Sequence, residues 1–103
     1  MEMKTSEVIR TIANEIEIIF RNSDFAEPRP LAVAHLEALH SRMRLRCGYC
    51  ADRLKRIVSL AENLYSARGH QSHPGGAKGV LRDVRANLEE MRSWATVWER
   101  NGK

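Results

Sequence analysis

The stretch RLRCGYCADRLKR, residues 44–56, decides the fold, because it holds both cysteines of the chain and Gly48, the only glycine in residues 30–68. Cys47 and Cys50 have the C-x-x-C spacing that is shared by zinc ligands, redox-active dithiols and two neighbours on one helix face. A helix that continues through Gly48 favours the last of these, whereas a break there leaves the other two open.

A heptad pattern of apolar residues runs through this stretch in both directions. Position a holds Val33, His40, Cys47, Leu54 and Ala61, and position d holds Leu36, Met43, Cys50, Ile57 and Leu64. The pattern predicts one long helix over about 30–68 that ends at Gly69. Gly48 falls at position b, on the outer face, where a glycine costs up to about 1 kcal/mol without having to break the helix. Within such a helix the two cysteines are small apolar members of the seam.

Two amphipathic segments flank the predicted long helix. Apolar residues recur at helical spacing over about 6–21 and again over about 76–100. A chain of 103 residues and 11.8 kDa has the size of one domain. The sequence therefore predicts a single all-α domain over 1–103, with three helices (about 6–21, 30–68 and 76–100), antiparallel packing and a long central helix.

Three helices of these lengths make a chain that is only two helices thick along much of the central helix. Because the wide apolar stripes cannot all be covered inside such a chain, we expect a homodimer, a dimeric helical bundle with a four-helix cross-section. The residues expected to mediate self-association are the seam positions Leu36, His40, Met43, Cys47, Cys50, Leu54, Ile57 and Leu64.

Zinc binding is the first alternative role for the cysteines. Cys47, Cys50, His70 and His73 have suitable ligand chemistry, but a helix over 51–68 would separate Cys50 from His70 by about 30 Å. A thioredoxin-like redox role needs the cysteine pair at a helix N-terminus after a strand, and no strand is predicted before it. The sequence therefore predicts buried seam thiols, no metal site and no cofactor.

A basic stripe is the strongest functional signal. Arg42, Arg46, Tyr49, Arg53 and Arg56 step by four, three, four and three residues, which places them on one face of the predicted long helix. Residues 31–70 hold seven basic against three acidic side chains. Such a face binds phosphates or an acidic partner surface, although charged helix faces are commonly only solvated. Trp94, at the edge of the apolar stripe of 76–100, is a further candidate for partner binding.

Several classes of protein are disfavoured. We find no catalytic set of side chains, so we do not expect an enzyme. The start MEMKTSEV has no apolar core, and no run approaches the roughly 18 apolar residues of a membrane span, so no membrane partner is expected. Two cysteines without a secretion signal favour a cytoplasmic protein.

These features favour a non-enzymatic regulatory protein that binds and sequesters another protein through exposed helix faces. In size and predicted architecture the chain resembles the small all-helical bacterial antiactivators that sequester quorum-sensing transcription factors. The resemblance rests on the seam VAHLEALHSRMRLRCGYCADRLKRIVSLAENL, residues 33–64, and on the two flanking amphipathic helices, and it implies a transcription regulator as the partner. The alternative is a nucleic-acid-binding protein that uses the basic stripe.

Overall fold

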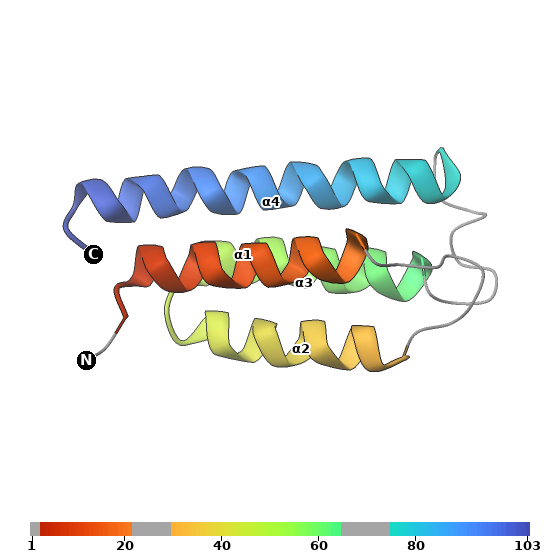
Figure 1. Ribbon diagram of the computed structural model, residues 1–103, viewed down its shortest axis with the longest axis horizontal. Coiled ribbons are helices and arrows are strands. Elements are labelled where there is room, and N and C mark those ends of the chain that lie inside the picture. The colour runs from red at the N-terminus through yellow and green to blue at the C-terminus, as the bar shows by residue number, and fades with distance from the viewer. Residues whose placement is uncertain (1–2, 22–29, 65–74) are drawn as a thin grey trace.

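The computed structural model describes residues 3–21, 30–64 and 75–103, and it has four helices in these ranges (Figure 1). They are α1 (Thr5–Arg21), α2 (Pro30–Arg44), α3 (Gly48–Leu64) and α4 (Gly76–Arg100). The all-α class is confirmed, and the predicted bounds of the first and last helices agree with α1 and α4 to within a residue. The prediction of three helices is wrong, because the central segment forms two helices rather than one.

The predicted helix over 30–68 stops at Arg44, and the chain turns through a corner of three residues, Leu45–Cys47. Two backbone N–H groups of this corner, those of Arg46 and Cys47, donate to the carbonyl of Met43 at 2.9 Å. These bonds satisfy a carbonyl that would otherwise be left without a partner at the end of α2. The corner therefore closes α2 with ordinary turn hydrogen bonds.

Cys47 begins the next helix as its N-cap. Its carbonyl accepts the N–H of Ala51 at 3.0 Å, and its Sγ accepts the N–H of Cys50 at 3.4 Å. The sulfur thus takes the place of the serine or aspartate oxygen that usually caps a helix. Gly48 is the first residue of α3, and a Cβ at this position would meet nothing within 4 Å. A larger side chain would therefore fit at position 48, so a lack of space there does not explain the break between α2 and α3.

The long helix is replaced by a hairpin because the hairpin lets one chain cover its own apolar seam. A straight helix would expose much of this seam to water, whereas α2 and α3, folded back on each other, bury it. The positions that the heptad pattern selects are the same in both arrangements, so the pattern could not distinguish them.

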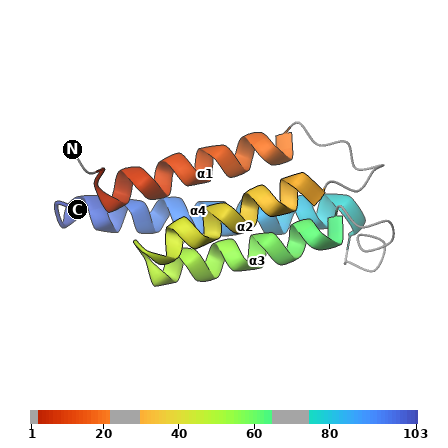
Figure 2. The same cartoon turned by 90° about the horizontal axis from the view of Figure 1, so that it is seen from below.

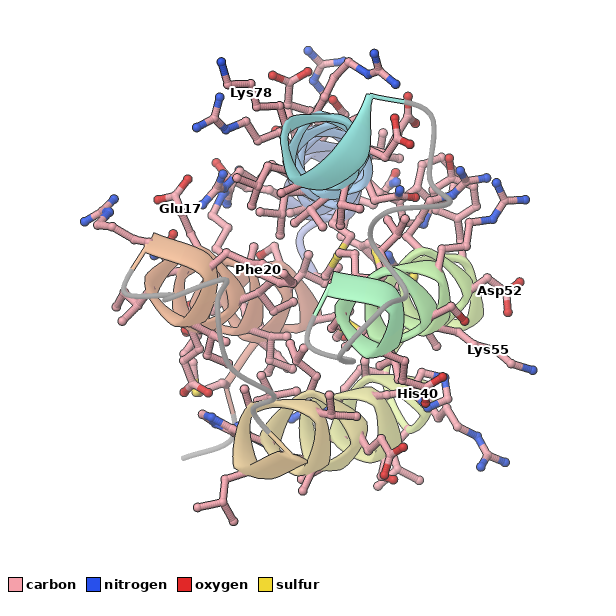
Figure 3. The ribbon with its side chains drawn as sticks, turned by 90° about the vertical axis from the view of Figure 1, so that its right-hand side faces the viewer. Glu17, Phe20, His40, Asp52, Lys55 and Lys78 are labelled. Atoms are coloured by element: carbon pink, nitrogen blue, oxygen red, sulfur yellow. The ribbon has the colours of Figure 1, made fainter. Side chains whose placement is uncertain are left out.

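The four helices form an up-down-up-down bundle in which each helix packs against two others (Figure 1, Figure 2). Seen along the bundle, α4 lies between α1 and α3, and α2 lies on the side opposite α4 (Figure 3). The bundle measures 44 × 23 × 20 Å. In the described part of the chain, no helix has both the length and the apolar character that a membrane span requires.

One hydrophobic core is shared by all four helices. Each helix contributes large side chains that are fully buried or nearly so: Ile9, Ile12 and Ile16 from α1, Leu36, Leu39 and Met43 from α2, Leu54 and Ile57 from α3, and Val80, Val84 and Met91 from α4. Burial of these side chains supplies the main driving force for the fold.

Polar contacts fix α1 against α4, the two helices that are most distant in sequence. The guanidinium of Arg92 donates to Asn14 Oδ1 at 3.0 Å and to Glu17 Oε1 at 3.3 Å. Arg10 forms an ion pair with Glu99. Because exposed ion pairs contribute little stability, these contacts mainly set the register of the two helices.

Truncation of a core leucine should destabilise the isolated chain. We expect Leu54→Ala, at a side chain with no exposed surface, to lower the free energy of unfolding by about 2–5 kcal/mol, measured by urea denaturation. Leu45→Ala at the corner is the matched control, because that leucine is 86% exposed and its truncation should change the free energy by about 0.5 kcal/mol or less. Equal effects of the two substitutions would contradict the core described above.

Candidate functional site

The predicted self-association seam lies inside the chain. Leu36, Met43, Cys50, Leu54 and Ile57 have no exposed surface, and Cys47 is 5% exposed. His40 is half-buried, and the side chain of Leu64 lies outside the described residues. The chain's own core therefore takes up the seam, and a homodimer, which stays a prediction, would need another surface.

The two cysteines are both buried and unpaired. Burial is the main cause that raises the pKa of the Cys50 thiol far above its usual range, and the neighbouring Cys47 thiol adds to the shift. Contrary to expectation the pair sits at a helix N-terminus, but a turn and a helix precede it instead of a strand. A buried thiol with a raised pKa is a poor nucleophile, so Cys50 is unsuited to thiolate chemistry.

The described residues contain no group of three or more histidine, cysteine, aspartate or glutamate side chains that could hold a metal ion. Two of the four candidate zinc ligands, His70 and His73, lie outside the described residues.

The corner divides the predicted basic stripe. Arg42 lies in the last turn of α2 and Arg46 lies in the corner itself, whereas Tyr49, Arg53 and Arg56 share one side of α3. The prediction of one continuous stripe on a single helix is therefore wrong. Its α3 part, however, meets the other predicted partner-binding residue, Trp94 of α4.

An aromatic pair joins α3 to α4. The rings of Tyr49 and Trp94 have centroids 4.9 Å apart and are tilted by 41°. The Tyr49 hydroxyl donates to Glu90 Oε2 at 2.9 Å, and the guanidinium carbon of Arg53 lies 5.1 Å from the centre of the Tyr49 ring. Tilted ring pairs and a cation over a ring are both favourable geometries. Both residues keep more than a third of their surface exposed, so the pair is held in place and is still accessible.

A groove of about 630 Å³ runs between α3 and α4 beside this pair. We call it the α3–α4 groove, and its lining consists of Arg53, Arg56, Ser59 and Leu60 from α3 and Asp83, Ala86, Asn87 and Glu90 from α4. Its α3 wall is basic and its α4 wall is acidic. Asp52 and Lys55 point outward from α3, whereas Lys78 lies on the side of α4 away from α3 (Figure 3).

The charges of the groove are only partly used within the chain. Glu90 accepts the bond from Tyr49, and Asp83 forms an ion pair with Arg82 at 3.3 Å. Arg53 Nε is buried and has no hydrogen-bond partner among the described residues. Arg56 is exposed and forms no ion pair within that part of the chain. The α3 wall thus offers positive charge to a molecule that enters the groove.

Glu90, Asp83 and Asn87 were not predicted as site residues. They lie on the stripe of α4 that also carries Trp94, at distances of four, eleven and seven residues from it, respectively. This spacing is visible in the sequence, but its meaning depends on which helix packs beside α4.

Searches for a matching family model, a similar curated protein or a similar solved structure find none.

The hydrogen bond to Glu90 is the main cause that raises the pKa of Tyr49 above its ordinary value of 10.0. The hydrogen bond between Tyr49 and Glu90 therefore stabilises the fold fully at pH values below the pKa of an unfolded tyrosine. This stabilisation is lost as the pH rises through the raised pKa of Tyr49 in the folded state.

We expect Glu90→Gln to lower the pKa of Tyr49. The titration is measured by phenolate absorbance in a Tyr65→Phe background, which leaves Tyr49 as the only tyrosine. Glu89→Gln is the matched control and should leave the titration unchanged; a shift of equal size in both would exclude Glu90 as the cause.

Proposed function

We propose that this chain is a non-enzymatic protein-binding regulator, and that the α3–α4 groove with the Tyr49–Trp94 pair is its binding surface. The observation that carries the proposal is the partly exposed cluster in which Arg53 and Tyr49 of α3 meet Trp94 of α4. Tryptophan, tyrosine and arginine are the residue types that dominate the energetics of protein interfaces. The cluster is built on two packed helices, so little conformational entropy is lost when it binds.

The groove favours a protein over a nucleic acid. A phosphate backbone that followed Arg53 and Arg56 would run opposite the carboxylates of Asp83 and Glu90. A protein surface can place groups of both signs along the two walls. The acidic α4 wall of the groove therefore does not support the hypothesis that this site binds a nucleic acid.

The partner's identity as a transcription regulator came from the resemblance to antiactivators. That resemblance rests on the seam over residues 33–64, taken as one helix, and on the two flanking amphipathic helices. The flanking helices are present as α1 and α4, whereas the seam forms a helical hairpin. The proposal is therefore limited to binding another protein and is supported by the α3–α4 surface alone.

Site-specific photo-cross-linking in the cells that produce the protein tests the proposal. With p-benzoylphenylalanine in place of Arg56 we expect a protein adduct, because position 56 lines the groove. The same probe in place of Lys78, on the side of α4 away from α3, is the control and should give little adduct. A further Trp94→Ala substitution should reduce the adduct at position 56 at least severalfold.

The proposal fails if position 56 gives no protein adduct, or if positions 56 and 78 give the same adducts in equal amounts. Circular dichroism of each variant confirms that the bundle is intact before the adducts are compared.

A further inference from the structure

We infer that the protein that fits the α3–α4 surface is a second copy of this chain, bound across a two-fold axis that runs parallel to the helices. The inference rests on the proposed function, because it uses the same surface. Its basis is the charge pattern: the α3 wall of the groove carries Arg53 and Arg56, and the α4 wall carries Asp83 and Glu90. A surface with one basic and one acidic half can be complementary to itself.

Symmetry selects the direction of the axis. A two-fold axis parallel to the helices places α3 of each copy against α4 of the other, so that opposite charges meet. An axis across the helices, within the interface, would instead place α3 against α3 and α4 against α4, where like charges repel. Only the first arrangement uses the charge pattern of the surface.

The register along the helices follows from contacts within the chain. Rotation about an axis parallel to the helices leaves each residue at the same height, so residues on a common level in one chain also meet across the interface. Tyr49 is level with Glu90, to which it donates a hydrogen bond, and with Trp94, against which its ring packs. Because α3 and α4 run in opposite directions, Arg53 and Arg56 extend from this level toward Asp83. The Arg53 and Arg56 of one copy therefore approach the Glu90 and Asp83 of the other.

The surface has the size and the apolar content that self-association requires. The bundle is 44 Å long and about 20 Å wide, and a standard interface buries about 800 Å² on each partner. Tyr49, Trp94 and Val97 are 36%, 37% and 38% exposed, and the two copies of the aromatic pair would cover each other at one end of the interface. Tyrosine, tryptophan and arginine are among the residue types that are enriched in protein interfaces.

Charge exchange between the two walls tests this arrangement. Light scattering coupled to size-exclusion chromatography should give the wild-type chain a mass of twice 11.8 kDa, and the dimer should weaken as salt is added. The variants R53E/R56E and D83R/E90R should each raise the dimer dissociation constant by at least about tenfold, because each makes both walls alike in sign. Lys78→Glu, on the other side of α4, is the control and should leave the constant unchanged.

A chain that combines R53E, R56E, D83R and E90R distinguishes the proposed dimer from dimers of other geometry, and a loss of binding from a loss of the fold. It should regain self-association, because its walls have exchanged signs, and it should not pair with the wild type in native mass spectrometry of a mixture. Pairing of the fourfold variant with the wild type would overturn the inference, since it requires α3 to face α3. A wild-type chain that stays monomeric would overturn it too, as would a dimer that neither double substitution weakens.

The cross-linking experiment at position 56 distinguishes failure of this inference from failure of the proposed function. An adduct with another protein, from a chain that is monomeric alone, removes the second copy and leaves the protein-binding function standing. A monomeric chain with no adduct at position 56 removes both.

Discussion

Each helix of the bundle can pack against two others because the chain reverses direction between Arg44 and Gly48. The reversal brings the two halves of one apolar seam face to face, and α1 and α4 then close the remaining sides of the core. Without it the seam residues Leu36, Met43, Leu54 and Ile57 would form a single exposed line. The corner that reverses the chain is held by modest interactions, three turn hydrogen bonds and a sulfur cap. Its stability therefore comes largely from the packing that it makes possible.

The closed core also determines which residues remain for function. Since the seam is buried inside the chain, the exposed side chains on the α3–α4 side are mainly aromatic and charged, with Val97 as an aliphatic neighbour. Tyr49 and Trp94 are held by contacts between two helices, and Arg53 lies over the tyrosine ring. Binding through such a surface depends on both rings and charges, so it is sensitive to salt as well as to apolar area. If a second copy and a different partner use this surface, they exclude each other.

The parts of the fold that periodicity controls could be predicted from the sequence. The bounds of α1 and α4 and the burial of Leu36, Leu54 and Ile57 follow from apolar spacing alone. The break could not be predicted in this way, because the heptad continues in phase across it and Gly48 lies on the outer face. The N-cap is a cysteine, which is not among the residues that usually signal a helix start. Tyr49, Arg53, Arg56 and Trp94 were predicted as binding residues, whereas the acidic wall required knowledge that α3 packs beside α4.

The placement of the two tryptophans gives the chain an internal optical probe. Trp98 packs against the core, and its indole Nε1 is buried, so its emission is set by the bundle interior. Trp94 stands at the rim of the α3–α4 groove against the Tyr49 ring, with part of its surface in water. A molecule that covers this rim would dehydrate Trp94 while leaving Trp98 as it was, and the emission would move to shorter wavelength with the bundle intact. Unfolding would move the emission of both indoles in the opposite direction, so one spectrum distinguishes an occupied surface from a lost fold.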